Sequence, residues 1–357
     1  MKKSLVVRRG DDPIDELVHP LGWEGIRHDS DLAMGKGEIL QSSAGSSLLS
    51  SMDLQAAQSV DTDFKSRLMA GIKLLRPAQW IKNTFVFMPL IFGARLFHWE
   101  EFSLVAAMFV TFCLASSATY ILNDYADVQQ DRAHPLKKSR PLASGIISPA
   151  VAFFLMAVLL VATFGLSALL GAPRSCYLLL AAYLGLQVAY CFLLKNLVIL
   201  DVLSISLGFL LRVLAGAEVV DLPLSSWLLL CTFSVAIFLA LGKRRHEVVI
   251  LNSQAVQHRR VLEDYSVALL DQLLQVVTTS TFIFYCLYCV RGNPETGVSA
   301  ERMMFTIPLV TYGIFRYLYL IYHKEEGGSP TALLLTDPPL LACSILWLTA
   351  CIAIIYY

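Results

Sequence analysis

Charged side chains are scarce in this sequence of 357 residues. Lys, Arg, Asp and Glu make up 16% of it and sum to a formal net charge of zero, whereas a soluble domain carries about 25%. Without a basic excess, we expect no nucleic-acid partner. Hydrophobic residues reach 56%, which indicates an integral membrane protein embedded in the lipid bilayer.

The eight cysteines lack the spacing of a zinc site. Nearly all of them lie inside apolar segments. Cys286 and Cys289 are three residues apart, but no second pair or nearby His completes a ligand set. We interpret the cysteines as small buried hydrophobic residues.

Residues 1–61 lack a long apolar run. No continuous apolar segment follows Lys2 and Lys3, so we expect no secretory signal peptide. The polar, Ser- and Gly-containing composition predicts a disordered extension. From residue 62 on, Leu68 and Ile72 among basic residues predict an amphipathic helix at the membrane interface, with an ordinary solvated helix as the alternative.

Apolar runs dominate residues 62–357, which we take as one domain. They lie at 84–97, 102–122, 147–171, 175–194, 197–217, 224–242, 272–290, 303–322 and 338–356. A helix needs about 20 apolar residues to span a bilayer, and the first run is short by that measure. We predict an all-α, polytopic bundle of about nine transmembrane helices.

Basic residues concentrate in alternate loops, at 65–82, 132–140 and 243–260. By the positive-inside rule, these loops and the N-terminus face the cytoplasm. The odd number of helices then places Tyr357 outside. We expect a multi-pass protein of the plasma (inner) membrane whose functional loops face the cytoplasm.

Three carboxylates follow the second apolar run. In a helix Asp124, Asp127 and Asp131 share one face, since they stand at i, i+3 and i+7. Carboxylate oxygens suit Mg2+, and Asn123 can coordinate the ion or orient Asp127. The alternative is a solvated helix end, in which repulsion between each like-charged pair costs about 0.2–0.5 kcal/mol. The pattern favours a Mg2+ site that binds a diphosphate.

Four cations come directly after the aspartates: Arg132, Lys137, Lys138 and Arg140. Arginine offers a bidentate fork to phosphate oxygens and lysine a point charge. An orientation signal or a contact to lipid headgroups is the alternative. We favour phosphate binding.

Ionisable residues also occur inside or beside later apolar runs. Lys195 and Asp201 flank the start of the fifth run, and Arg212 and Arg316 lie within spans. Such residues are functional candidates by default. Structural ion pairs are the alternative, for instance Asp201 with Lys195, or Arg316 with a carboxylate on a neighbouring helix.

Lys243, Arg244 and Glu247 end the sixth run. They either contact substrate phosphates or act as cationic anchors at the headgroups, with Lys243 and Glu247 as a surface pair.

The ordered motifs resemble the UbiA superfamily of intramembrane prenyltransferases. The resemblance rests on Arg76-Pro-x-Gln-Trp-x-Lys82-Asn83 and on Asn123-Asp-x-x-Asp127-x-x-x-Asp131, and runs from about residue 66 to the C-terminus. Three further motifs resemble its decaprenyl-phosphate phosphoribosyltransferase branch: Asp131-Arg132-x-His134-Pro135-x-Lys137-x-x-Arg140-Pro141, Leu210-Leu211-Arg212 with Ala215-Gly216, and Gly242-Lys243-Arg244 with Glu247.

One departure from the wider superfamily concerns the loop after the sixth run. Ordinary members carry a second Asp-rich motif there, whereas this loop begins Lys-Arg-Arg-His-Glu. The resemblance therefore implies transfer of 5-phosphoribose from 5-phosphoribosyl 1-diphosphate to a polyprenyl phosphate, with Mg2+ as cofactor. It implies Asn123, Asp124, Asp127 and Asp131 as metal residues and the three aspartates as catalytic. The implied substrate-binding residues are Lys82, Asn83, Arg132, Lys137, Arg140, Lys195, Arg212, Lys243, Arg244 and Glu247.

Two other functions remain open at this point. One is prenyl transfer from a prenyl diphosphate to an aromatic acceptor. The other is a transporter or lipid-binding protein whose Arg212 and Arg316 line an anion path. A monomer and a homo-oligomer are equally compatible with the sequence.

Overall fold

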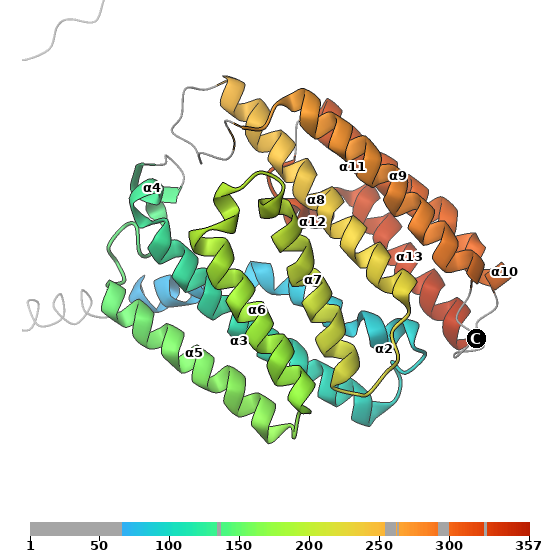
Figure 1. Cartoon of the computed structure of the whole chain (residues 1–357), viewed down its shortest axis with the longest axis horizontal. Coiled ribbons are helices and arrows are strands. Elements are labelled where there is room, and N and C mark those ends of the chain that lie inside the picture. Colours follow the sequence, from blue (N-terminus) through green and yellow to red (C-terminus); the bar gives the residue numbers. More distant parts are fainter. Residues whose placement is uncertain (1–65, 134–136, 254–261, 263, 292–299, 325–326) are drawn as a thin grey trace, which may run out of the picture. The chain divides into compact units, whose positions relative to one another are not determined.

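The computed structural model describes residues 66–133, 137–253, 262, 264–291, 300–324 and 327–357. All of them belong to the unit Thr62–Tyr357. They form helices and connecting turns and contain no strand (Figure 1), which confirms the all-α prediction. The polar extension at 1–61 lies outside the described residues.

Eight helices of the described chain are long and apolar enough to cross a bilayer. They are α3 (Trp99–Ala126), α5 (Pro149–Leu169), α6 (Arg174–Phe192), α7 (Leu200–Glu218), α8 (Ser226–Ser253), α9 (Val267–Arg291), α11 (Ile307–His323) with the preceding η5 (Met304–Thr306), and α13 (Pro338–Tyr356). Each coincides with one of the predicted apolar runs.

The first predicted run, 84–97, differs from the others. Here the chain forms η1 (Pro77–Phe87), a 3-10 helix, and then the five-residue α2 (Met88–Phe92). Pro89 lacks a backbone N–H donor, so one continuous α-helix is unfavourable across this point. The segment is therefore an irregular one that packs on α3 and α7.

Short elements connect the long helices. They are α4 (Val128–Ala133), η2 (Lys137–Ser139), η3 (Leu194–Asn196), α10 (Ala300–Met303) and α12 (Pro330–Thr336). Figure 1 shows α4, the turn between α6 and α7, and the C-terminal part of α8 toward the same end of the bundle. That end carries the aspartate motif, Lys195 and Arg244, which are far apart in the sequence.

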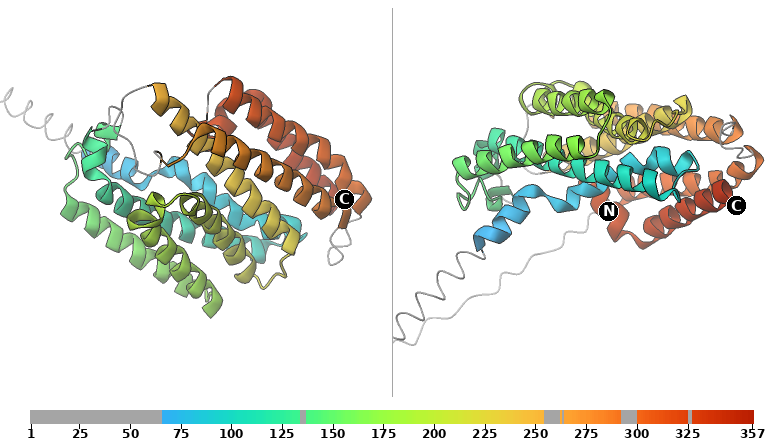
Figure 2. Two further views of the ribbon diagram at one scale, coloured as in Figure 1. Left: turned by 45° about the horizontal axis from the view of Figure 1, so that its top comes forward. Right: turned by 90° about the horizontal axis from the view of Figure 1, so that it is seen from below.

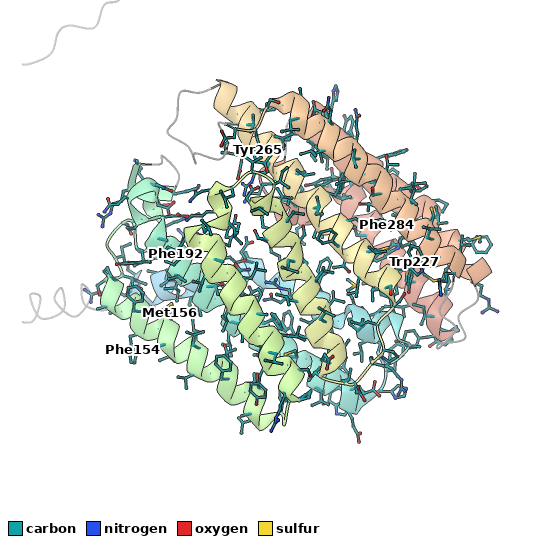
Figure 3. All side chains as sticks on the ribbon, viewed as in Figure 1. Phe154, Met156, Phe192, Trp227, Tyr265 and Phe284 are labelled. Atoms are coloured by element: carbon teal, nitrogen blue, oxygen red, sulfur yellow. The ribbon has the colours of Figure 1, made fainter. Side chains whose placement is uncertain are left out.

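The innermost helices are α3 and α7. In the most apolar window of each, 61% of the residues are buried, against 17% for α13. Helix α3 packs on η1, α5 and α6, and α7 packs on η1, α6 and α8. Apolar side chains cover the outside, as Phe154 of α5 illustrates at 71% exposure (Figure 3). The polar side chains of α3 and α7 are thus enclosed by protein, as expected for costly polar groups in a membrane.

A helix over residues 66–75 precedes η1 and projects from one end of the bundle (Figure 2). Its Leu74 is fully buried, while Leu68 and Ile72 are exposed. This exposed apolar side fits the predicted interfacial helix. The chain then turns at Arg76, which adopts a left-handed conformation with φ 52° directly before Pro77.

Gly216 allows η1 to lie directly against α7. A Cβ atom at this position would overlap the backbone carbonyl of Val86 in η1. Small residues permit such close backbone approach between membrane helices. Gly216 therefore sets the distance between the two elements that carry Lys82, Asn83 and Arg212.

We predict that Gly216→Ala lowers the free energy of unfolding by about 1–3 kcal/mol or more, because overpacking forces the backbone of η1 to shift. Thermal unfolding in detergent would measure this loss. Gly185→Ala is the matched control, since a Cβ at Gly185 on α6 meets no atom within 4 Å. That control should be neutral or stabilising by up to about 1 kcal/mol, and equal losses in both variants would contradict the prediction.

Candidate active site

The three aspartates lie where α3 gives way to α4. Asp127 caps the C-terminus of α3, and its N–H donates to Asn123 O at 3.0 Å. The N–H of Asp131 donates to Asp127 O at 2.8 Å, so helical hydrogen bonding continues across the junction. Each of the three aspartates is only 3–4% exposed.

Arginines from two other segments neutralise the first and third aspartates. Arg140 Nη1 lies 3.0 Å from Asp124 Oδ1 and 2.6 Å from Asp131 Oδ2. Arg76 forms a second ion pair with Asp124. Because buried carboxylates are costly without charged partners, these pairs fix the loop that carries Arg140 against the end of α3.

Asp127 has a different set of partners. Lys195, in η3, forms a buried ion pair with its Oδ1, and Asn123 Nδ2 donates to its Oδ2 at 3.2 Å. The amide oxygen of Asn123 faces the thiol of Cys191 at 3.7 Å. In this arrangement Asn123 orients Asp127 and does not present its oxygen to the aspartates.

The donor set fits Mg2+ in its chemistry, since three buried carboxylates supply the oxygen ligands that this ion prefers. Within the described residues, no three His, Cys, Asp or Glu side chains form a ready metal cluster. Arg140 Nη1 contacts carboxylate oxygens of both Asp124 and Asp131. Asp124 and Asp131 would hold Mg2+ once this guanidinium moves aside.

A second group joins η1, α6 and α7 around Arg212, which is 5% exposed. Its Nε donates to Asn83 Oδ1 at 2.7 Å, its Nη1 to Gly208 O at 2.7 Å, and its Nη2 to Tyr183 OH at 3.0 Å. The guanidinium also lies 4.7 Å from the centre of the Tyr183 ring. These partners hold the cation, but none of them carries a negative charge.

Lys82 adds a second positive charge to this group. Burial, together with the positive charges of Arg212 and Arg76, lowers its pKa to about 8. Within the described part of the chain, no carboxylate pairs with Lys82 or Arg212. Lys82, Asn83 and Arg212 therefore form a cationic group that can bind an anion.

A third group surrounds Arg244, which is 2% exposed. Its Nε lies 2.5 Å from Asp201 Oδ2, its Nη1 pairs with Glu247, and its Nη2 reaches Tyr190 OH at 3.4 Å. Arg244 is thus fully engaged by protein groups. The alternative pair of Asp201 with Lys195 does not form, because each residue has another partner.

Four further candidates have contacts of their own. Lys243 Nζ is 3.7 Å from Glu247 Oε1, and Lys137 is half-buried in η2. Arg132 is exposed and its Nε donates to Ala143 O at 3.2 Å, which ties the loop to α4. Arg316 pairs with Asp337 at the start of α13, which agrees with the structural alternative for this intramembrane cation.

Three residues of these groups, Arg76, Cys191 and Tyr265, were not predicted to contact the site. Arg76 begins the Arg76-Pro-x-Gln-Trp motif, so the sequence did indicate a role for it, and it pairs with Asp124. Tyr265 OH lies 2.8 Å from Asp201 Oδ1, and nothing in its sequence context indicated this contact. All eight cysteines are free thiols and none is exposed, as expected for small hydrophobic residues.

Comparison with known proteins places this geometry in a family. The model of the UbiA prenyltransferase family matches residues 85–335. The decaprenyl-phosphate phosphoribosyltransferase of Mycolicibacterium smegmatis is 34% identical over 301 residues, covering 81% of this chain and 94% of the relative. The protein of that name from Corynebacterium glutamicum is 32% identical over 289 residues, covering 80% and 86%.

Solved structures agree on the fold. A UbiA homolog from Archaeoglobus fulgidus bound to GPP and Mg2+ superposes with a TM-score of 0.60 at 17% identity, covering 81% of this chain and 100% of that one. A digeranylgeranylglyceryl phosphate synthase gives 0.54 at 17% identity, covering 82% and 99%. With the family model and the curated relatives, this establishes that the chain belongs to the UbiA prenyltransferase family, as a multi-pass membrane transferase similar to the decaprenyl-phosphate phosphoribosyltransferases.

Proposed function

We propose that this protein transfers 5-phosphoribose from 5-phosphoribosyl 1-diphosphate to a decaprenyl-type polyprenyl monophosphate, with Mg2+ as cofactor and diphosphate as the other product. The names of the relatives, which align over most of both chains, support this substrate pair. We place the reaction at the cytoplasmic face, on the basis of the basic loops.

The observation that carries the proposal is the cationic group of Lys82, Asn83 and Arg212. Arg212 is buried and Lys82 is half-buried, and positive charges removed from water without a carboxylate partner are costly. A bound anion reduces that cost. A phosphate acceptor would supply this anion. We place the phosphorylated donor at the aspartates and the phosphorylated acceptor at the cationic group.

The reaction forms a bond between an acceptor phosphate oxygen and C1 of the ribose, while the bond from C1 to the diphosphate breaks. A bound Mg2+ would neutralise charge on the leaving diphosphate. Arg76, Arg140 and Lys195 already lie against the aspartates and can donate hydrogen bonds to that diphosphate. A phosphate monoester is ionised at pH 7, because its second pKa is near 6, so the acceptor needs no general base.

The sequence suggested that Arg244 binds substrate, whereas we propose a structural role for it. Its guanidinium is engaged by Asp201, Glu247 and Tyr190, so we assign it to positioning α7 against α8. Lys243, which is about half exposed, remains the candidate for the lipid headgroup at this end of α8.

A direct assay separates the two transferase functions. Purified protein is given either 5-phosphoribosyl diphosphate with a polyprenyl phosphate, or a prenyl diphosphate with an aromatic acid such as 4-hydroxybenzoate. We expect Mg2+-dependent labelling of the lipid by phosphoribose in the first mixture. Turnover in the second mixture alone would overturn the proposal.

Within that assay we predict that Asp131→Asn lowers phosphoribosyl transfer by about 10²-fold or more, because the neutral amide cannot replace a carboxylate that holds a cation. Asp221→Asn is the matched control, since Asp221 is exposed between α7 and α8. Its left-handed φ of 51° also suits asparagine. Activity of Asp131→Asn equal to that of the control would remove Asp131 from the site.

The lowered pKa of Lys82 predicts that binding of the acceptor depends on pH. Its pKa of about 8 lies below the ordinary value of 10.5, so its positive charge is present below about pH 8 and is lost above it. We expect the KM for polyprenyl phosphate to rise by about tenfold between pH 7 and pH 9.5, as one charged hydrogen bond is lost. Lys82→Arg stays charged throughout this range and should show a flat profile. Superimposable profiles of the two proteins would contradict this role.

A further inference from the structure

Ile199 has an unfavourable backbone conformation. It caps the N-terminus of α7 with φ 70° and ψ −44°, a region that β-branched residues rarely adopt. Its side chain is 49% exposed, so packing of that side chain does not explain the conformation. Such strain persists only where surrounding contacts enforce it.

Tyr265 supplies those contacts. Its hydroxyl oxygen accepts a hydrogen bond from Ile199 N at 2.7 Å and donates one to Asp201 Oδ1 at 2.8 Å. The side chain is 3% exposed and comes from the segment directly before α9 (Figure 3). One hydroxyl group thus holds both sides of the turn at the start of α7.

The same turn carries Lys195. This lysine lies in η3, four residues before Ile199, and its 6% exposed side chain pairs with Asp127. The path from Lys195 to Ile199 is short, and backbone hydrogen bonds close it, including Leu197 N to Leu194 O at 3.1 Å and Asp201 N to Leu197 O at 3.0 Å. We therefore expect a change at Ile199 to be transmitted to Lys195.

Asp201 connects the turn to α8. Its second carboxylate oxygen, Oδ2, lies 2.5 Å from Arg244 Nε, and Arg244 also pairs with Glu247. Asp201 is completely buried. The turn is accordingly fixed to α8 through Arg244 and to the segment before α9 through Tyr265.

We propose that Tyr265 is a positioning residue for the aspartate site: its hydroxyl holds the strained turn at Ile199 and thereby sets Lys195 against Asp127. Tyr265 acts through Lys195 and not on the substrate. The kinetic part of the inference rests on the proposed function, whereas the positional part does not. Loss of the hydroxyl lets the turn relax, and Asp127 loses a fixed partner.

The first experiment does not depend on activity. Lys195 in the purified full chain is acylated with an amine-reactive reagent, and its labelling rate is read by mass spectrometry. In Tyr265→Phe, which keeps the ring, we expect Lys195 to label about tenfold faster than in the wild type. Tyr317→Phe is the matched control, because Tyr317 is 3% exposed and its hydroxyl has no hydrogen-bond partner among the residues that the structure describes. Equal labelling of Lys195 in all three proteins overturns the proposal.

The second experiment uses phosphoribosyl transfer. We expect Tyr265→Phe to raise the KM for 5-phosphoribosyl diphosphate and the Mg2+ requirement by about 10-fold, as for residues that support metal ligands. The KM for polyprenyl phosphate should stay within about twofold, since the cationic group of Lys82, Asn83 and Arg212 keeps its own contacts. A uniform loss of kcat alone, with both KM values unchanged, would overturn the positioning role.

A rescue variant distinguishes positioning from loss of folding. Glycine adopts positive φ without strain, so Ile199→Gly should make the turn independent of its hydroxyl partner. In Tyr265→Phe with Ile199→Gly we expect slow labelling of Lys195 and near wild-type kinetics to return. Fast labelling that persists in the double variant overturns the proposal. If the wild-type protein does not transfer phosphoribose, the proposed function is refuted. The labelling of Lys195 then still tests the positional inference.

Discussion

The central constraint on this protein is the cost of placing carboxylates in a bundle that is surrounded by lipid. Each site aspartate is nearly inaccessible to solvent, and each is neutralised by a cation from a different segment. Removing one partner from a buried ion pair costs about 3–5 kcal/mol. The pairs therefore hold together the end of α3, the loop behind α4 and the turn between α6 and α7, while they assemble the site.

The two innermost helices show how this constraint shapes the fold. Helix α3 leads into the three aspartates and α7 carries Arg212, and the irregular segment η1 packs on both helices. The glycine at position 216 lets η1 approach closely, and Asn83 then meets Arg212. The acidic group at the end of α3 and the cationic group around Arg212 are therefore joined through the same packed elements, and no ion pair between them is present among the described residues.

Much of this could be predicted from the sequence, for physical reasons. Apolar runs of bilayer length are a strong signal, and eight of them became helices. The spacing of Asp124, Asp127 and Asp131 predicts a shared face; in the structure Arg140 contacts Asp124 and Asp131, whereas Asp127 pairs with Lys195. The segment from residue 84 was the exception, since Pro89 interrupts a run that hydropathy alone reads as continuous.

The pairing of charges could not be read from the sequence. Arg76 and Lys195 lie 48 and 68 residues from their aspartates in the sequence. The sequence alone does not determine which of several cations pairs with each carboxylate. Asp201 was therefore assigned Lys195 as its alternative partner, although Arg244 holds it. Tyr265 had no local signal, because its role depends on a strained backbone that only the structure reveals.

The contact of one guanidinium nitrogen of Arg140 with both Asp124 and Asp131 has a thermodynamic consequence. If Asp124 and Asp131 hold Mg2+, as we propose, the ion would compete with this arginine for the same oxygens, and each would weaken binding of the other by the same factor. The arginine acts as an internal counter-ion that reduces mutual repulsion of the carboxylates. Loading of the ion would then be coupled to release of the loop at Arg140.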